Sequence, residues 1–446
     1  QIPMNSPAIP SFRYQIFFLI MLTPLPNYID RGAIAYASAS ILPAYGFDKA
    51  DWGNVLGYFG YGYILGALVG GILADRFGAK RIWLIAGATW SIFEIATAFA
   101  GDFGLAFLGG SAMAGFATIR VMFGFAEGPA YSVINKSVAN WATPKERGFV
   151  VSVGLLSTPL GALLTAPVAV GLQTLTGSWR SMFVVLGVAS LALLIYFMTR
   201  FTNTPDENPR VSKAELDFLR RERAEAANAS TPTTSVAPVW HFFKNKDLLL
   251  NAVGYFSFVY VTFLLLTWTP KYLQDEFHYN LSSLWYMGMI PWTGACFTVL
   301  LGGKISDWLL RRTGNLKVAR SWLAATCLLL TTLCFIMVSQ AQTVWGVIAL
   351  MTLANALNAL PNSVYWAVVI DTAPSNRVGA YSGMTHFIAN TASFIAPMLT
   401  GYLTVHYGYS SMFVAAAVAT ALGMSAMLMV RPGGRQVAPP SVPAAV

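Results

Sequence analysis

The stretch Gly71-Ile-Leu-Ala-Asp-Arg-Phe-Gly-Ala-Lys-Arg81 lies between two long apolar segments, and a related stretch, Gly303-Lys-Ile-Ser-Asp-Trp308, lies 232 positions further along the chain. Both stretches place an aspartate four residues after a glycine, and both follow an apolar segment. Similarity within one chain at a long, fixed spacing indicates repeated structural units. These two stretches therefore predict a molecule built from two similar halves.

Two further pairs of landmarks repeat at almost the same spacing. Arg147 corresponds to Arg377, and Ser181-Met-Phe-Val184 corresponds to Ser411-Met-Phe-Val414, in each case 230 positions later. Each pair occupies the same place relative to the apolar segments around it. Transporters built from two parallel repeats bind their ligand between the repeats, near the middle of the membrane. The pattern therefore predicts two bundles with a site between them.

Composition indicates that this chain folds in a lipid bilayer. It is 56% hydrophobic and only 11% charged, whereas about 25% of the residues of a soluble domain are charged. A helix needs about 20 predominantly apolar residues to cross the hydrocarbon, and twelve stretches are long enough. We therefore expect an all-α membrane protein with twelve transmembrane helices in two six-helix bundles. The twelve stretches lie near residues 14–42, 52–74, 82–100, 106–135, 148–172, 181–199, 248–270, 283–305, 321–339, 343–369, 379–403 and 411–430.

The distribution of Lys and Arg predicts the topology. With the N-terminus inside, 23 of the 28 basic residues fall on the cytoplasmic side, two lie within spans and three face outward. Because cytoplasmic loops carry the excess of basic residues, we expect both termini in the cytoplasm and the chain in the inner (cytoplasmic) membrane. The predicted units are a six-helix bundle at 1–199, a cytoplasmic linker with an amphipathic helix at 200–246, a second six-helix bundle at 247–430 and a disordered tail at 431–446.

The sequence argues against several other classes of protein. The net charge of +9 comes from basic clusters between apolar segments, where anionic lipid and topology explain them better than nucleic acid does. No G-x4-G-K-[ST] motif for ATP and no H-E-x-x-H motif for zinc occurs. The three cysteines show neither metal spacing nor a disulfide framework. We expect no enzyme activity and no cofactor, and we expect a monomer.

Four ionisable residues lie inside the predicted spans. Asp30 and Arg31 are neighbours in the first span, and Arg120 and Glu127 lie seven residues apart in the fourth. At 1.5 Å per residue, the roughly 16 span residues before Asp30 and 11 after Arg31 place this pair well within the hydrocarbon. Ionisable groups at that depth are costly and indicate function by default. The alternative is that each pair only fixes helix packing.

Helical geometry places these groups relative to their neighbours. Seven residues at about 100° each leave Glu127 roughly 20° from Arg120, on one helix face. Gly124 lies between them and makes room for a ligand or for a neighbouring helix. Tyr28 lies about 60° from Arg31 on its own helix, so that its hydroxyl can share the face of the arginine. A guanidinium in a dry site presents a planar fork that matches a carboxylate.

Glu94, in the third span, is a further ionisable residue. It is either a third proton site or a group that satisfies a neighbouring helix, and we favour the second interpretation.

Several motifs together resemble one known family. Gly71-x-x-x-Asp75-Arg76 is similar to the loop motif of the major facilitator superfamily. Within that superfamily, the sequences around Asp30-Arg31, the Arg120-x6-Glu127-Gly-Pro129 pattern, Trp141-Ala-Thr-Pro-Lys-Glu-Arg147 and Leu266-Thr-Trp-Thr-Pro-Lys-Tyr-Leu273 resemble the anion:cation symporters. That family includes bacterial sugar-acid:proton symporters, such as galactonate carriers, and the mammalian sialin and vesicular glutamate carriers. The resemblance covers nearly the whole chain.

The resemblance implies roles for individual residues. It implies that Asp30 and Glu127 couple transport to protons, and that Arg120 contacts substrate or relays protons. It also favours substrate contacts at Tyr63 and Trp366, and at two departures from the family pattern: Thr158, where sugar-acid carriers often have glutamine, and His386, where they commonly have asparagine. Asp75, Arg76 and Asp307 are expected to act in gating. With Tyr28, Arg31, Asn362 and Asn390, these complete the candidate site.

Asn362 and Asn390 are candidates because of their position on polar helix faces. Asn362 shares a face with Trp366, and Asn390 shares one with His386. Amides facing lipid are unfavourable, so these side chains face protein or a water-filled cavity. Hydrogen bonding between helices explains them as well as ligand contact does.

The predicted function is proton-coupled import of an organic anion by alternating access. Hydroxyl and amide groups on the candidate faces favour a sugar acid, namely an aldonate, aldarate or hexuronate. The many Tyr and Trp residues keep an aromatic or other small monocarboxylate as the alternative. A drug:proton antiporter fits the fold alone, but two buried arginines would repel a cationic drug.

Overall fold

A computed structural model describes residues 12–229, 239–374 and 377–433, and the side chains of 144–145, 147–149, 151–153 and 226–229 are not described. Most of the predicted tail, 434–446, lies outside the described residues. Within these ranges every regular element is helical. The first helices are α1 (Arg13–Leu22), α2 (Pro24–Ala33), η1 (Ile34–Ala37), α3 (Ser38–Tyr45), α4 (Lys49–Phe77), α5 (Ala79–Thr97), α6 (Ala100–Phe107), α7 (Ala112–Glu127), α8 (Ala130–Trp141), α9 (Pro144–Thr176) and α10 (Trp179–Arg200).

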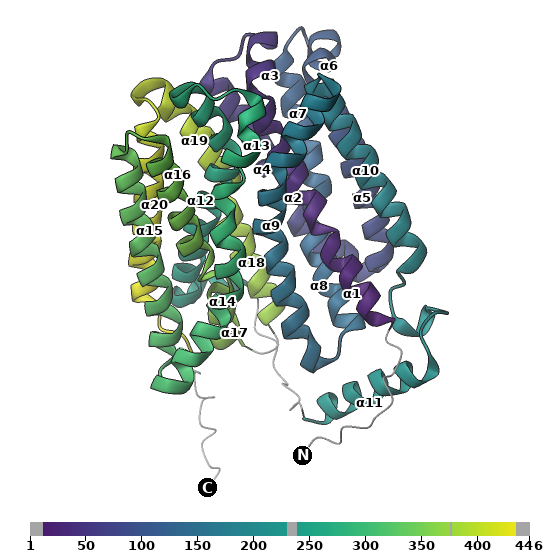
Figure 1. Ribbon diagram of the computed structural model, residues 1–446. Helices are drawn as coiled ribbons and strands as arrows, with labels where there is room; N and C mark the ends of the chain where they lie inside the picture. Colours follow the sequence, from purple (N-terminus) through teal and green to yellow (C-terminus); the bar gives the residue numbers. More distant parts are fainter. Residues whose placement is uncertain (1–11, 230–238, 375–376, 434–446) are drawn as a thin grey trace.

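The second part of the chain continues after a helix that lies crosswise to the others, α11 (Figure 1). The remaining elements are η2 (Pro205–Glu207), α11 (Lys213–Ala229), η3 (Val239–Lys244), α12 (Lys246–Phe277), η4 (Leu281–Ser283), α13 (Leu284–Met287), α14 (Ile290–Thr313), η5 (Lys317–Trp322), α15 (Leu323–Gln340), α16 (Val344–Ala359), α17 (Asn362–Thr372), α18 (Val378–Asn390), α19 (Ala392–Tyr407) and α20 (Ser410–Met429).

Most of the predicted spans appear as long apolar helices. In the described part of the chain, eight helices are long and apolar enough to cross a membrane, or nine if α5 and α6, bent by 78°, form one span. The other three predicted spans, 14–42, 106–135 and 379–403, are each covered by consecutive helices with short breaks. The breaks have local causes in two cases: Pro24 and Pro26 start α2, and Gly128-Pro129 separates α7 from α8.

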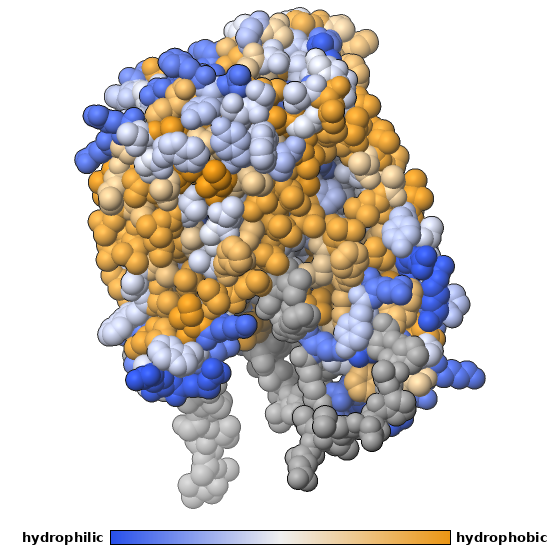
Figure 2. Space-filling model, viewed as in Figure 1, coloured by the Kyte–Doolittle hydropathy of each residue, from blue (hydrophilic) through white to orange (hydrophobic). Residues whose placement is uncertain are grey.

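The helices form two groups that lie side by side. Helices α1 to α10 make up one group and α12 to α20 the other (Figure 1). Hydrophobic residues cover the middle of the face in Figure 2, with hydrophilic residues toward its two ends. We call the end that carries α11 the α11 end, and the opposite end the far end. The belt fits a molecule whose sides face lipid and whose two ends face water.

At the far end, α4 and α19 are in close backbone contact. A Cβ atom on Gly53 would lie 2.7 Å from the carbonyl oxygen of Pro397 and 2.9 Å from the Cα of Gly401. Lys49 adds an ion pair across the two groups, with its Nζ 3.9 Å from Oδ2 of Asp275. Glycine permits this approach because it has no side chain. The two halves are therefore packed together at the far end.

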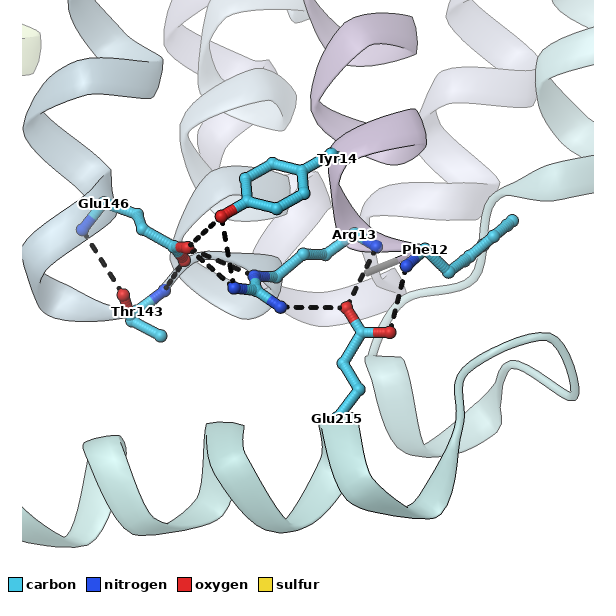
Figure 3. Close-up of polar contacts among 6 residues, drawn as sticks. All are labelled: Phe12, Arg13, Tyr14, Thr143, Glu146 and Glu215. Atoms are coloured by element: carbon cyan, nitrogen blue, oxygen red, sulfur yellow. Dashed lines mark hydrogen bonds and ion pairs between the residues drawn. The ribbon is translucent and has the colours of Figure 1, made fainter. Parts of the chain in front are cut away.

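Toward the α11 end, three glycines of α9 and α18 have open space beside them among the described residues. A Cβ atom on Gly154 of α9, or on Gly379 or Gly383 of α18, would meet no atom within 4 Å. Here the described hydrogen bonds of Glu215 attach α11 to the first half. Glu215 of α11 is fully buried and accepts hydrogen bonds from the backbone N–H groups of Phe12 and Arg13, at 3.0 and 3.1 Å (Figure 3).

A second carboxylate completes the attachment of α1. Nη1 of Arg13 lies 3.1 Å from Glu215 and Nη2 lies 3.0 Å from Glu146 at the start of α9 (Figure 3). Glu146 also closes a capping box with Thr143. Burial raises the pKa of Glu146, but the hydrogen bonds from Arg13 and Thr143 outweigh it, and the pKa lies below its ordinary value. One arginine thus ties α1, α9 and α11 together.

Candidate functional site

The central feature is a buried ion pair between α2 and α7. Nε of Arg31 lies 2.7 Å from Oε2 of Glu127, and neither side chain is more than 1% exposed. Nη2 of Arg31 also donates to Oδ1 of Asn27, one turn earlier on α2. Arg31 therefore pairs with Glu127 on another helix and not with Asp30, its neighbour in the sequence.

Aromatic rings surround the Arg31 guanidinium. Its Cζ lies 4.6 Å from the ring centre of Tyr28, 4.4 Å from that of Tyr63 and 5.2 Å from that of Phe59. A cation over aromatic faces is attracted to their quadrupoles, more strongly where water is excluded. The rings therefore hold the cation in place without neutralising it.

The first half meets the second at this cluster. The hydroxyl of Tyr63 lies 3.4 Å from Nε2 of His386 on α18. The His386 ring stacks on Trp366 of α17, with centres 5.9 Å apart, and lies 6.0 Å from the ring of Tyr131 and 6.3 Å from that of Tyr255. The arginine cluster of one half thus faces an imidazole and an indole of the other.

Hydroxyl groups line the adjoining part of the site. The Tyr131 hydroxyl lies 3.2 Å from that of Thr158 on α9 and 3.4 Å from that of Tyr28. Such groups can donate or accept hydrogen bonds. The region therefore combines a cation, aromatic faces and hydroxyls.

A second set of ionisable groups lies next to the ion pair. Asp30 accepts a hydrogen bond from the Ser190 hydroxyl of α10 at 3.3 Å. Arg120 is 1% exposed and lies over Phe123, with 4.9 Å from Cζ to the ring centre. Its Nε and Nη1, and both carboxylate oxygens of Glu94, have no hydrogen-bond partner among the described residues.

We expected Gly124 to make room on α7 for a ligand or for a neighbouring helix, and the structure places the helix α4 there. A Cβ atom there would lie 2.0 Å from the carbonyl oxygen of Phe59 and 2.9 Å from the backbone nitrogen of Tyr63. The glycine thus brings α4 against α7, which places Tyr63 beside Arg31. Gly124 itself leaves no space for a ligand.

Two predicted lining residues make no described hydrogen bond to a side chain of the aromatic cluster. Asn390 donates its amide to the backbone carbonyl of His386 at 2.8 Å, on its own helix. Asn362 is 3% exposed and its side-chain oxygen has no partner among the described residues. Their neighbours Asn355 and Asn358 donate to backbone carbonyls of other helices, at 3.0 and 3.2 Å. The polar faces therefore serve packing at least in part.

The predicted gating residues lie at the α11 end. Asp75, at the end of α4, forms an ion pair with Lys136 of α8 at 2.7 Å. Asp307 of α14 lies 3.3 Å from Nη1 of Arg320, whose Nε pairs with Asp371 of α17 at 3.0 Å. The Arg76 guanidinium lies 5.3 Å from the ring centre of Phe77. Each of these contacts lies within one half.

Of the rings beside His386, sequence reasoning missed two, those of Tyr131 and Tyr255. Tyr131 follows Glu127 by four residues, a spacing that places two side chains on one helix face, and this signal was available. Tyr255 stands in an apolar run of α12 and carries no comparable signal. Only the folding of α12 against α17 and α18 brings it to the site.

The two side-by-side groups of long apolar helices are a transporter architecture, and comparisons with known proteins identify the family. The model of the Major Facilitator Superfamily matches residues 20–397 and 313–445. This chain belongs to the Major Facilitator Superfamily, which is a family of transporters and not of enzymes. It is therefore a multi-pass membrane protein.

Individual relatives are similar along most of the chain. The hexuronate transporter of Bacillus subtilis (strain 168) is 30% identical over 421 residues, with 94% of each chain covered. The probable galactarate/D-glucarate transporter GudP of Escherichia coli (strain K12) is 27% identical, with 88% of this chain and 87% of that one covered. The D-galactonate transporter of Escherichia coli O6:H1 (strain CFT073) is 29% identical, with 96% and 98% covered.

Among solved structures, a bacterial homolog of the human lysosomal transporter Spinster, in an inward-facing and occupied conformation, has a TM-score of 0.74 at 15% identity. The match covers 96% of this chain and 97% of that one. At this identity the likeness concerns the fold. The major facilitator fold predicted from the sequence is therefore confirmed.

Proposed function

We propose that this protein imports an organic anion together with protons. The observation that carries the proposal is the buried Arg31–Glu127 ion pair, which faces His386 and Trp366 of the other half. While Glu127 is ionised, it neutralises Arg31. When Glu127 takes up a proton, Arg31 is left without its counter-ion in a dry site, where an unpaired charge is costly. An anionic ligand then replaces the carboxylate.

In this proposal Asp30 and Glu127 are the proton-binding acids. Arg31 binds the substrate, with Tyr28, Tyr63 and Thr158 supplying hydroxyls from the first half. Trp366 and His386 would close the site from the second half, and Tyr131 joins them. Asn362 and Asn390 remain proposed substrate contacts, and Arg120 is proposed to contact the substrate or to relay protons. No cofactor takes part, since the coupling ion is the proton.

A sugar acid is the substrate class that we favour. The three relatives are named as transporters of hexuronate, of galactarate or D-glucarate, and of D-galactonate. The hydroxyls of Tyr28, Tyr131 and Thr158 lie in one chain of contacts and suit a polyhydroxylated ligand, because each can both donate and accept.

An aromatic or other small monocarboxylate is the second candidate. The observation in its favour is the set of rings around the Arg31–His386 region, in which Tyr255 and Trp366 have ring centres 5.3 Å apart. Aromatic side chains stack on aromatic ligands as readily as on the apolar face of a sugar. A panel of substrates separates the two candidates.

We further propose that the α11 end faces the cytoplasm and the far end faces outward. The basic residues of α11, and Arg311 and Arg312 at the end of α14, lie at the α11 end, in line with the positive-inside rule. In this orientation the contact of α4 with α19 closes the outward-facing end, which corresponds to one state of alternating access. Asp75, Arg76 and Asp307 would then pair across the halves only in the opposite state.

The test is uptake by proteoliposomes that contain the purified protein. An inward proton gradient should drive accumulation of D-glucuronate, D-galactonate or D-glucarate above that of benzoate. Accumulation of benzoate alone would favour the second candidate. If the uptake of every acid is the same with and without the gradient, proton coupling is rejected.

A variant tests the role of Glu127. Glu127→Gln keeps the size of the side chain but leaves Arg31 permanently without a carboxylate partner. It should lose gradient-driven accumulation and retain exchange of labelled for unlabelled substrate across the membrane. Full accumulation by this variant would refute the assignment.

A further inference from the structure

Five ionisable groups lie together inside the first half, and three of them are acids. Asp30 and Arg31 come from α2, Glu94 from α5, and Arg120 and Glu127 from α7. All are 2% exposed or less. With every group ionised, three carboxylates and two guanidiniums leave the cluster with one uncompensated negative charge. A buried, uncompensated charge is costly and is normally removed by binding a proton.

The contacts decide which acids are neutralised by arginine. Glu127 is the direct partner of Arg31 at 2.7 Å. Arg120 has no direct ion pair with a described residue, and the acids that interact with it electrostatically are Glu94, Glu127 and Asp30. Glu127 is already paired with Arg31, and Asp30 accepts a hydrogen bond from the Ser190 hydroxyl. Glu94, whose two carboxylate oxygens have no partner among the described residues, is therefore the counter-ion that remains for Arg120.

The surroundings of Glu94 support this pairing. Its two carboxylate oxygens and the Nε and Nη1 of Arg120 are all buried without hydrogen-bond partners among the described residues. The ionisable groups that interact with Glu94 are Asp30 of α2 and Arg120 and Glu127 of α7. Within the described chain, the other helices packed on α5, namely α4, α8 and α10, present no such group to it.

We propose that Glu94 is a positioning residue for proton coupling: it is the counter-ion of Arg120, and it thereby makes Asp30 the acid that holds a proton before substrate binds. This inference rests on the proposed function and assigns an order to its two proton-binding steps. Asp30 is protonated first, because neither arginine is its direct partner. Glu127 is protonated second, and its protonation frees Arg31 for the anion.

The charge balance of the cycle follows from this order. With one proton on Asp30, the cluster without substrate is neutral. With a second proton on Glu127, it carries one positive charge, which a monoanion at Arg31 neutralises. If Glu94 were absent, Asp30 would become the counter-ion of Arg120, and the cluster would be neutral with no proton bound. Glu94 thus acts on Asp30 through Arg120.

Infrared spectroscopy of the purified protein in lipid tests the proposal without any substrate. At pH 7 the wild type should show the carbonyl-stretch band of a protonated, buried carboxylic acid. The band should shift when aspartate, and not glutamate, is labelled with ¹³C at the side-chain carboxyl. A band that shifts only with labelled glutamate, or no band at all, would overturn the proposal whatever any variant does.

Matched variants test the part played by Glu94. Glu94→Gln should lose the band at pH 7, because Asp30 then ionises to pair with Arg120, whereas Glu94→Asp should keep it. Asp30→Asn should lose it as well. A band that persists in Glu94→Gln contradicts the role of Glu94. Failure of the proposed function would appear separately, as wild-type uptake that does not depend on the proton gradient.

Discussion

Arg31 does two things that a lysine cannot do together. Its Nε and Nη2 contact two different acceptors, Glu127 and Asn27, while its planar face lies over Tyr28 and Tyr63. A guanidinium presents several donors in fixed directions and stacks on rings, whereas an ammonium is a compact, strongly hydrated charge. In the function that we propose, the geometry of this one side chain would set the orientation of a bound carboxylate.

Replacing Arg31 by lysine tests this conclusion. Arg31→Lys keeps the charge but loses the fork and the stacking, so the substrate concentration for half-maximal exchange should rise about tenfold or more, equivalent to ~1.4 kcal/mol. The measurement is the concentration dependence of exchange in proteoliposomes. Arg220→Lys, on the exposed surface of α11, is the matched control and should leave exchange unchanged.

The ring and the hydroxyl of Tyr63 have separable effects. Tyr63→Phe removes the contact with His386 but keeps the ring near Arg31, so affinity should fall only about two- to fivefold, as expected for one neutral hydrogen bond. Tyr63→Leu also removes the ring, and affinity should fall about tenfold or more because a desolvated cation–π contact is lost. Equal effects of the two changes in the same exchange assay would show that the ring contributes nothing.

The sequence predicted which charged residues lie inside the helix bundle, where the structure buries them, but not how they pair. Periodicity placed Arg120 and Glu127 on one face of a helix, and chain adjacency placed Asp30 beside Arg31. The structure pairs Arg31 with Glu127 across two helices instead. Spacing along a helix determines neighbours on that helix, whereas the distance between α2 and α7 depends on packing, including the contact of Gly124 with α4.

Among the single elements, α11 is attached to the first half by described contacts of Glu215. It is the helix that the sequence predicts within the linker 200–246, and its first turn is capped by the Ser212 hydroxyl, which accepts from the Glu215 backbone nitrogen at 3.2 Å. What the sequence did not indicate is that the Glu215 side chain turns to Phe12 and Arg13. A glutamate in a charged helix is usually solvated, and this one is fully buried.

Glu215→Gln should therefore weaken the attachment of α11. The amide cannot neutralise Arg13, and a buried cation that loses its partner is destabilising by several kcal/mol at most; Glu146 remains as a second partner, so we expect about 1 to 2 kcal/mol. The thermal unfolding temperature of the purified protein should fall. Glu225→Gln, on the same helix, is the control, and an equal fall in both variants would contradict the attachment.

The pH dependence of this attachment has a definite sign. Because the pKa of Glu146 in the folded protein lies below its ordinary value, ionised Glu146 stabilises the fold above about pH 4.5. This contribution is lost as pH falls through the lower, folded value. Between pH 6 and pH 4 the wild type should thus lose more thermal stability than Glu146→Gln does. Equal losses would show that the Arg13–Glu146 contact does not contribute.

At the scale of the whole molecule, the internal repeat predicted two halves and a site between them, and the described contacts join Tyr63 of one half to His386 of the other. The repeat did not predict where the halves touch. Glycines in apolar helices have many possible causes, and only the structure shows that Gly53 and Gly401 face each other across the far end. Contacts between units depend on their relative placement, which no periodicity within one unit determines.

The glycine contact leads to a prediction about the conformational equilibrium. In Gly53→Ala the new Cβ would lie 2.7 Å from the Pro397 carbonyl oxygen and 2.9 Å from the Cα of Gly401. Both are backbone atoms of α19, so relief requires the helices to separate. The state that is closed at the far end should become less populated, and the state that is open there should gain. Transport should slow, because the cycle needs both states.

Accessibility of a cysteine at the far end measures this shift. Thr404 lines a cavity there together with Lys49 and Asp275, and it is 4% exposed when the far end is closed. In a background without native cysteines, Thr404→Cys should react with an impermeant maleimide several times faster when Gly53→Ala is present. Gly171→Ala is the matched control, because a Cβ atom on this helical glycine would meet nothing within 4 Å. If both alanine variants leave the labelling rate unchanged, the halves do not separate at this contact, and the far end is not a gate.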